Sequence, residues 1–132
     1  MSVYKYNMNI QIKTTGGLTT TAAIDEYIGK RFESLEKFTA GDTTVFAVVE
    51  LGRTTGHHKH GEIFRAEVHI TGKTVGKNGE VFVVAVREDL YAAIDAARDE
   101  AIRELSSAKS KRTTLVRRGG AKVKNMIKGF FN

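Results

Sequence analysis

The hydrophobic pattern of this chain switches between two periods, and the order of the switches constrains the fold more than any other feature. Residues 4–13 alternate without a break between apolar and polar side chains, which is typical of a half-buried strand. Over residues 21–38 the apolar side chains recur at spacings of three and four, which predicts an amphipathic helix. The same helical rhythm returns after Asp89. Three further strand-like segments lie between the two helices, at residues 43–51, 62–71 and 81–86.

Short local signals mark where these elements begin and end. A run of threonines at residues 19–21 offers an N-cap for the first helix, and Asp89 offers one for the second. The segment at residues 72–79 contains an Asn-Gly pair at residues 78–79, which is a hairpin signal between the last two strands. Residues 52–61 contain three glycines and no periodicity, which predicts a loop. Beyond Lys111 the apolar rhythm of the second helix fades.

The order strand, helix, strand, strand, strand, helix predicts an α+β fold. A crossover through the first helix would place the first two strands side by side and parallel, whereas the short connections between the others predict an antiparallel meander. Each helix has a single apolar stripe, so both helices are expected on one face of the sheet. We therefore predict a two-layer α/β sandwich of order β-α-β-β-β-α, with a four-stranded mixed sheet and two helices on one face.

The positive charge of the chain is concentrated at its C-terminal end. The 132 residues carry a formal net charge of +6, and residues 109–132 contain eight basic side chains and no acidic one. The rest of the chain has 13 basic and 15 acidic residues. Such a segment indicates a polyanionic partner, most simply nucleic acid, and the alternative is a solvated tail without specific contacts. We divide the chain into a domain over residues 1–112 and a basic tail over residues 113–132.

Composition excludes several classes of protein. The absence of cysteine leaves no disulfide framework and no thiolate metal site, which is typical of a reducing compartment. No segment approaches the roughly 18 consecutive apolar residues that a membrane span needs. The N-terminus also lacks the apolar core of a signal peptide. We expect a cytoplasmic protein without a membrane partner.

Signals for catalysis are weak. His57, His58 and His60, with Glu62 nearby, could in principle bind zinc or nickel, but a glycine-flanked loop has no scaffold to fix their geometry. A polar loop tip that contacts solvent or phosphate is the simpler interpretation. The sequence has no phosphate-binding glycine motif and no nucleophile elbow. We predict no catalytic residue, no cofactor, no metal and no small-molecule substrate, and keep a metal-dependent enzyme built around the three histidines as an open alternative.

The basic residues of the two helices are more informative, because they lie off the apolar stripes. Two parallel helices on one sheet face would bring them onto one outer surface, which suits the phosphate backbone of a folded RNA. Acidic residues share these faces, so two ordinary amphipathic helices remain an alternative. The candidate RNA contacts of the helices are Lys30, Arg31, Lys37, Arg98, Arg103, Lys109, Lys111 and Arg112.

Two helical segments of the chain resemble a known family. Residues 87–112, which read REDLYAAIDAARDEAIRELSSAKSKR, resemble the second helix of the ribosome hibernation promoting factors and ribosome-associated translation inhibitors. In that family a D-[LM]-Y-x-A-I-[DN] start leads into a basic helix end. The first helix is similar in Ile24, Ile28, Arg31 and the LEKF sequence at residues 35–38. The resemblance spans about residues 8–112, and because the chain ends at Asn132 without a second domain, it resembles the short form.

The resemblance implies a non-enzymatic cytoplasmic protein that silences ribosomes in starved or stationary-phase cells. Such a protein binds the small ribosomal subunit and the whole ribosome, occupies the mRNA and tRNA decoding channel, and inhibits translation by occlusion while it preserves idle ribosomes. Off the ribosome it is expected to be a monomer. Carried across by position, the implied rRNA contacts are Arg31, Lys37, Arg103, Lys109 and Lys111, whereas Asp89 and Tyr91 are implied to fix the start of the second helix.

Two departures from the family pattern change where the positive charge lies. Glu100 and Glu104 occupy parts of the second helix where relatives often carry basic or neutral groups. The face of the second helix is therefore less positive, and RNA binding is expected to depend more on the tail. There Gly119 and Gly120 would allow close approach of the backbone to phosphates. The tail residues expected to run along rRNA are Arg117, Arg118, Lys122, Lys124 and Lys128. A general module for structured RNA, not specific to ribosomes, stays open as an alternative function.

Overall fold

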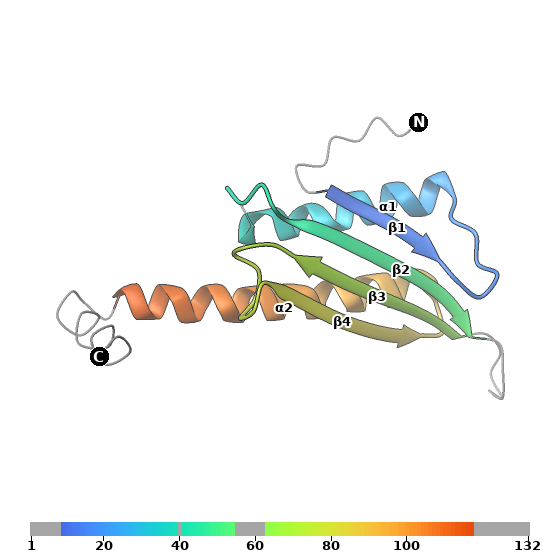
Figure 1. The fold of residues 1–132 in the computed structure, drawn as a ribbon. Coiled ribbons are helices and arrows are strands. Elements are labelled where there is room, and N and C mark those ends of the chain that lie inside the picture. Colours follow the sequence, from blue (N-terminus) through green and yellow to red (C-terminus); the bar gives the residue numbers. More distant parts are fainter. Residues whose placement is uncertain (1–8, 40, 55–62, 118–132) are drawn as a thin grey trace.

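The computed structural model describes residues 9–39, 41–54 and 63–117, and Figure 1 shows how their helices and strands are arranged. The predicted order of elements is confirmed, with a short 3₁₀ helix, η1, added after the first helix. The elements are β1 (Asn9–Thr14), α1 (Ala22–Phe32), η1 (Glu33–Phe38), β2 (Phe46–Thr54), β3 (Ile63–Thr71), β4 (Glu80–Arg87) and α2 (Leu90–Arg117).

The four strands form one mixed sheet in the order β1-β2-β3-β4. β1 runs parallel to β2, with Ile10 beside Ala47. The β2–β3 and β3–β4 pairs are antiparallel, as predicted for a meander, with Val49 opposite Val68 and Val68 opposite Val83. The predicted fold class is therefore confirmed, including the parallel pair that the crossover through α1 implies.

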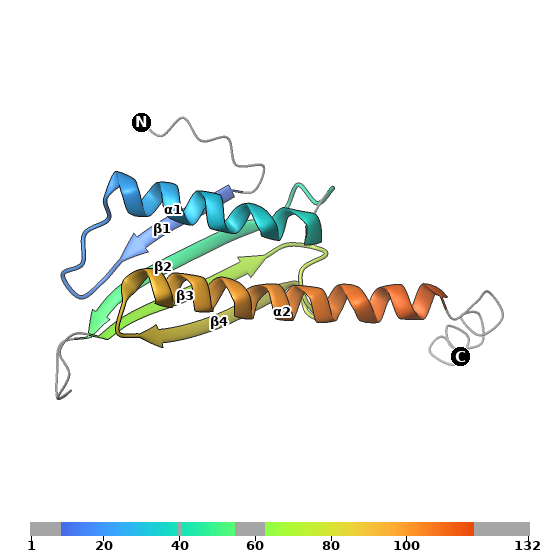
Figure 2. The same ribbon diagram turned by 180° about the vertical axis from the view of Figure 1, so that it is seen from behind.

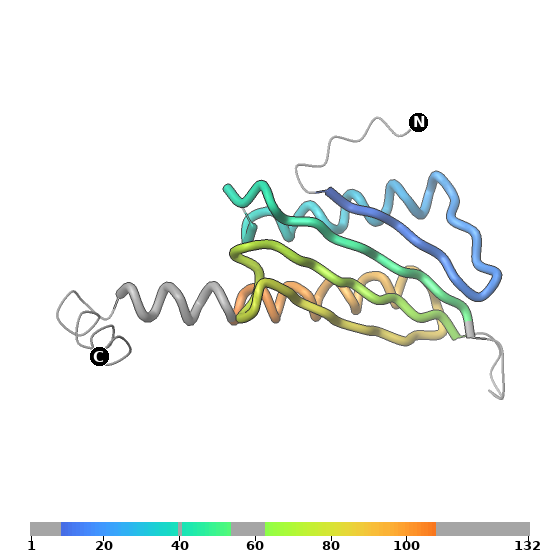
Figure 3. Tube along the Cα trace, viewed as in Figure 1, coloured from blue at the N-terminus to red at the C-terminus, as the bar shows by residue number. Residues whose placement is uncertain are grey.

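Both helices cover the same face of the sheet, as the view from behind shows (Figure 2). The Cα trace follows the same path, with α1 and the first turns of α2 side by side behind the strands (Figure 3). The core lies between these layers and joins alternate residues of the strands to one stripe from each helix. Its largest fully buried side chains are Phe32, Ile28, Leu35, Leu51, Ile70, Ile94, Val49, Val68 and Val75.

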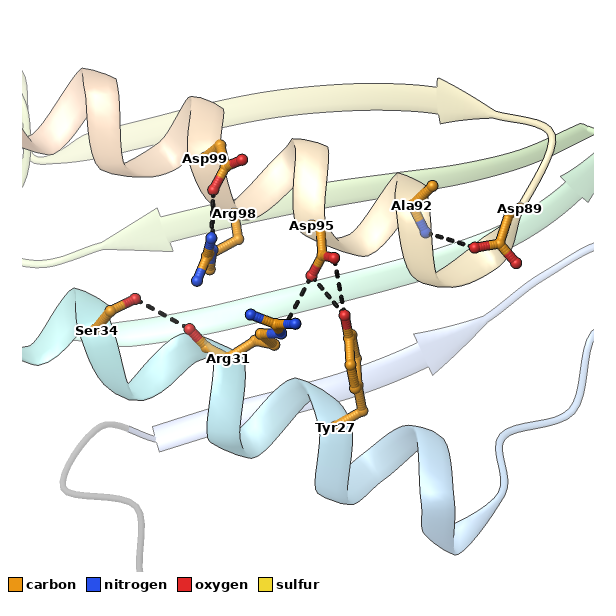
Figure 4. A network of polar contacts seen from close by, with 8 residues as sticks. All are labelled: Tyr27, Arg31, Ser34, Asp89, Ala92, Asp95, Arg98 and Asp99. Atoms are coloured by element: carbon orange, nitrogen blue, oxygen red, sulfur yellow. Dashed lines mark hydrogen bonds and ion pairs between the residues drawn. The ribbon is translucent and has the colours of Figure 1, made fainter.

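The caps predicted for the two helices are both present. The Oγ1 atom of Thr21 accepts a hydrogen bond from the Ile24 backbone N–H at 3.2 Å. At the start of α2, the carboxylate of Asp89 accepts a hydrogen bond from the Ala92 backbone N–H at 3.0 Å (Figure 4). Each bond satisfies one of the backbone donors that the first turn of a helix leaves without a partner.

The first helix is shorter than predicted, because the expected α-helix over residues 21–38 ends at Phe32 and continues as η1. Two features explain the change. The Ser34 hydroxyl donates to the Arg31 carbonyl at 3.0 Å, which competes with the regular backbone bond. A 3₁₀ helix also has three residues per turn, which brings the buried Leu35 and the partly buried Phe38 to the same side, against the core.

The predicted loop over residues 52–61 is wrong at its beginning, because β2 continues to Thr54. β2 extends this far because its last residues pair with the start of β3. Thr54 lies opposite Ile63, and Gly52 lies opposite Arg65. A Cβ atom at residue 52 would lie 2.8 Å from the Thr15 Oγ1 atom, so a larger residue there would require the Thr15 side chain to move. At the other end of the chain, α2 continues to Arg117, past the point where its apolar rhythm fades.

Asp42 joins the loop before β2 to the turn between β3 and β4. Its Oδ1 atom accepts from the Thr44 backbone N–H at 2.9 Å, and its Oδ2 atom accepts from the Thr74 backbone N–H at 2.9 Å and the Thr74 hydroxyl at 2.7 Å. The hydroxyl groups of Thr44 and Thr74, followed by the Thr74 backbone N–H, hold the pKa of Asp42 well below its ordinary value.

The face of the sheet away from the helices is not covered by any described element, and it carries the exposed apolar side chains Phe46, Phe82, Val84 and Val86. Phe82 is 55% exposed and lies against His69, with the two ring centroids 5.7 Å apart. Among the described helices, none is long and apolar enough to cross a membrane.

Candidate nucleic-acid interface

Facing residues of α1 and α2 form a polar network where the two helices run side by side (Figure 4). The Tyr27 hydroxyl lies 2.8 Å from each carboxylate oxygen of Asp95. The Nε atom of Arg31, one turn further along α1, lies 3.4 Å from the Asp95 Oδ1 atom. The Arg31 guanidinium also lies over the Tyr27 ring, 5.1 Å from its centroid. Asp95 therefore anchors a tyrosine and an arginine from the neighbouring helix.

The network changes the protonation equilibria of its members. Burial, followed by the hydrogen bond to Asp95, raises the pKa of Tyr27. The Tyr27 hydroxyl, followed by the negative charge of Asp95, raises the pKa of Arg31. Both shifts extend to higher pH the range in which the phenol is neutral and the guanidinium is charged. The site therefore presents a fixed cation next to an aromatic ring.

The other predicted contacts on α1 and η1 are exposed and also have neighbours. The Nζ atom of Lys30 lies 3.1 Å from the Glu26 carboxylate, one turn earlier on α1. The Nζ atom of Lys37 on η1 lies 5.1 Å from the centroid of the Phe38 ring. Both side chains lie off the apolar stripe, as the sequence predicts.

On α2, the predicted contacts Arg98 and Arg103 each pair with a carboxylate of the same helix. The Nε atom of Arg98 donates to Asp99 Oδ1 at 3.1 Å, and Arg103 pairs with Glu100. The hydrogen bond to Glu100, followed by its charge, raises the pKa of Arg103. Arg98 is partly buried, whereas the Arg103 side chain is largely exposed.

Acidic side chains outnumber basic side chains on the described parts of the helices. Over α1, η1 and residues 90–107 there are five basic and eight acidic residues. After residue 107 the sequence contains basic residues and no acidic ones. The net positive charge of the candidate interface therefore comes from the end of α2 and the residues that follow it.

The remaining predicted contacts lie only partly within the described residues. The backbone of α2 carries Lys109, Lys111, Arg112 and Arg117 on one continuous helix, but their side chains are outside the described part. Arg118, Lys122, Lys124 and Lys128 lie outside the described residues altogether.

The histidine cluster also lies outside the described residues, since His57, His58, His60 and Glu62 all fall within residues 55–62. Among the residues that the structure describes, no group of three or more histidine, cysteine, aspartate or glutamate side chains is arranged to bind a metal ion. The metal-dependent alternative therefore rests on the sequence pattern alone.

Sequence reasoning missed three arginines at one end of the sheet. Arg53 is the penultimate residue of β2, Arg65 is the third residue of β3 and Arg87 is the last residue of β4. The register places Arg53 and Arg87 on either side of Phe64. Arg65 pairs with Glu67, and Arg87 donates to the Val86 carbonyl at 2.7 Å. No spacing rule would have joined Arg53 and Arg87, because antiparallel pairing brings them together from strands on either side of β3. Arg65 follows Phe64 in β3 and therefore lies on the opposite face of the sheet.

Comparison with known proteins decides the family. Residues 10–113 match the family model described as Sigma 54 modulation protein / S30EA ribosomal protein. The chain belongs to this S30EA family. The resemblance inferred from the two helices is confirmed.

Curated relatives of this S30EA protein include ribosome hibernation promoting factors. Those of Klebsiella oxytoca and Escherichia coli K12 are 29% and 28% identical to it, each over 103 residues that make up 77% of this chain and 96% of the relative. These homologues are ribosome hibernation factors, a class of non-enzymatic binding proteins, and the prediction that this chain is not an enzyme agrees with them.

Two solved structures share the fold of this chain. The crystal structure of the Thermus thermophilus Protein Y N-terminal domain aligns with a TM-score of 0.59 and 30% identity, over 78% of this chain and 98% of that domain. A ribosomal subunit interface protein from Coxiella burnetii aligns with a TM-score of 0.58 over 78% of this chain and 99% of that protein. At 14% sequence identity, this structural alignment shows a shared fold alone.

The S30EA match ends at Thr113, and this separates the candidate contacts into two groups. Those on α1, η1 and α2 up to Arg112 lie within the family region. Arg117, Arg118, Lys122 and Lys124 lie beyond it, in a segment that the match does not cover.

Proposed function

We propose that this S30EA protein binds the small ribosomal subunit in the decoding channel and inhibits translation by occlusion, which preserves idle ribosomes in stressed or stationary-phase cells. The main support is the match of residues 10–113 to the S30EA family, together with curated relatives named ribosome hibernation promoting factor. The protein would act in the cytoplasm, on the small subunit and the whole ribosome, and would be a monomer when it is not bound.

The proposed interface has a helical part and a tail. The helical part contains Lys30, Arg31, Lys37, Arg98, Arg103, Lys109, Lys111 and Arg112, and the tail part contains Arg117, Arg118, Lys122 and Lys124. Because α2 continues to Arg117 without interruption, it leads directly from the first part into the second. Together the two parts would supply the basic side chains that contact the phosphate backbone of rRNA.

The ion pairs of the helical part do not prevent this role. An exposed ion pair stabilises a protein by only about 0.2–1 kcal/mol. An rRNA phosphate can therefore replace Glu26 beside Lys30, or Glu100 beside Arg103, at small cost. The tail, residues 113–132, adds five basic side chains and no acidic one.

Inhibition in this proposal needs no chemical step. No bond forms or breaks, because the protein and the decoding ligands compete for the same space on the small subunit. Phosphate contacts dominate such binding, so the affinity falls steeply as the salt concentration rises.

Sucrose-gradient co-sedimentation of the purified protein with ribosomes and separated subunits tests the proposal. Migration with the small subunit and the whole ribosome at low salt, lost at high salt and blocked by bound tRNA and mRNA, is the expected result. Protein that remains at the top of the gradient at low salt would overturn it. Equal competition by free duplex RNA would favour the alternative function, a general module for structured RNA.

A further inference from the structure

Tyr91 is an exposed aromatic residue in the helical layer. The exposed large apolar side chains among the described residues are Phe46, Phe82, Val84, Val86 and Tyr91. The first four lie on the uncovered face of the sheet, whereas Tyr91 lies on α2, beside the candidate RNA contacts, and is 38% exposed. Tyr91 is therefore not a core residue, and burial in the core does not explain an aromatic side chain at this position.

The geometry of the Tyr91 ring leaves a surface for stacking. Its centroid lies 4.7 Å from that of Tyr27, and the two ring planes are at 87°. In such a perpendicular pair the edge of one ring meets a face of the other, so the pair leaves at least one face of each ring uncovered. Tyr27 is held by Asp95 and lies under Arg31, which leaves Tyr91 as the more accessible of the two rings.

The neighbours of Tyr91 favour nucleic acid over an apolar partner. Tyr91, Asp95 and Arg98 follow each other along α2 at spacings of four and three, so they share one side of the helix. The Asp95 carboxylate holds Arg31 from α1 at this side. An exposed ring beside a fixed guanidinium can receive a nucleobase and its phosphate together, which is how proteins recognise the unpaired bases of folded RNA.

We propose that the Tyr91 ring stacks on an unpaired nucleobase of the bound RNA, with Arg31 placed to contact an adjoining phosphate. This inference rests on the proposed function and adds to it a contact that does not depend on charge. The resemblance alone implies that Tyr91 only fixes the start of α2; its exposure and its place beside Arg31 assign it a second role.

Substitution of Tyr91 in the full chain tests the stacking contact. Tyr91→Leu keeps an apolar side chain and removes the ring, and it is expected to weaken binding to small ribosomal subunits about tenfold, in the range of one base–aromatic stack. The slope of affinity against salt should stay unchanged, because a stacking ring releases no counterions. Tyr91→Phe restores the ring and should recover most of the affinity. Phe82→Leu, which removes an exposed ring from the opposite face of the sheet, is the matched control.

A second measurement separates stacking from a structural role. The chain has no tryptophan, so quenching of a single-stranded oligonucleotide containing 2-aminopurine can be measured without interfering protein emission. The wild-type protein and Phe82→Leu should quench the probe, and Tyr91→Leu, with a thermal midpoint close to that of the wild type, should not.

Each outcome has a distinct meaning. Wild-type binding to subunits, with Tyr91→Leu equal to wild type in both affinity and quenching, would overturn the stacking contact and leave the proposed function in place. A wild-type protein that binds no small subunits would overturn the proposed function itself. A loss of affinity in Tyr91→Leu without a difference in quenching would assign the ring to a protein contact and overturn the inference.

Discussion

The hydroxyl of Tyr27 on α1 lies 2.8 Å from both carboxylate oxygens of Asp95 on α2, so one phenol joins two helices whose contacting residues are 68 positions apart in the chain. The same carboxylate holds Arg31, which is one of the candidate rRNA contacts. Asp95 therefore links the stability of the helical layer to the availability of a cation for RNA.

This double role predicts opposite effects of one substitution. Asp95→Asn removes the charge but keeps the shape, so the free energy of unfolding should fall by about 1 kcal/mol, since the hydrogen bond from Tyr27 and the pair with Arg31 weaken. The affinity for small subunits at low salt should rise, because Arg31 no longer has a competing carboxylate. Urea unfolding and co-sedimentation measure the two effects. Glu33→Gln on η1 is the control, and a change in the same direction for stability and affinity would contradict the double role of Asp95.

Asp42 should make stability depend on pH in the acidic range. Its native pKa is held below the ordinary value by Thr44 and Thr74, so the unfolded chain binds a proton more readily than the folded chain. The stabilisation is complete above the ordinary aspartate pKa of about 3.9 and is lost as the pH falls toward the lower native value. In urea unfolding, Asp42→Asn should destabilise the protein at pH 7 and differ less from wild type at pH 3. If the difference in unfolding free energy between wild type and Asp42→Asn were as large at pH 3 as at pH 7, the hydrogen bonds of Asp42 would not be the source of this pH dependence.

The two parts of the basic surface should differ in their effect on salt dependence. Deletion of residues 113–132 should weaken ribosome binding and flatten its dependence on salt, by about one unit of slope for each phosphate that the tail neutralises. The double substitution Arg98→Gln and Arg103→Gln should change the slope less, because it removes two basic side chains whereas the deletion removes five. Affinity measured between low and high salt distinguishes the two variants. An unchanged slope after the deletion would mean that the tail makes no phosphate contacts.

The two faces of the sheet should respond differently to the removal of apolar side chains. Leu51 is fully buried between the sheet and the helices, so Leu51→Ala should cost about 2–5 kcal/mol of unfolding free energy through reduced burial and a residual cavity. Phe82 is 55% exposed on the uncovered face, and Phe82→Leu should change stability by about 0.5 kcal/mol or less. Denaturant titration of both variants checks this. A comparable loss of stability in Phe82→Leu would show that the uncovered face contributes to the stability of the fold.

Local patterns in the sequence were sufficient to predict most of the fold. Alternation in the strands, single stripes on the helices and the caps at Thr21 and Asp89 involve residues at most four positions apart, and each was predicted correctly. The layer arrangement followed because each helix has a single apolar stripe, and strands that alternate, such as β1 and β3, offer one apolar face for both stripes to pack against. The identity of the basic residues, and the absence of acidic residues after position 107, are also properties of the sequence alone.

Only the tertiary structure decided how these residues meet. The extension of β2 to Thr54 depends on pairing with β3, and the change from α1 to η1 depends on bringing Leu35 and Phe38 against the core. The contact between Tyr27 and Asp95 likewise requires α1 and α2 to pack side by side. Sequence spacing can place a side chain on one face of its own helix, but the partner of that side chain is set by the packing of elements far apart in the chain.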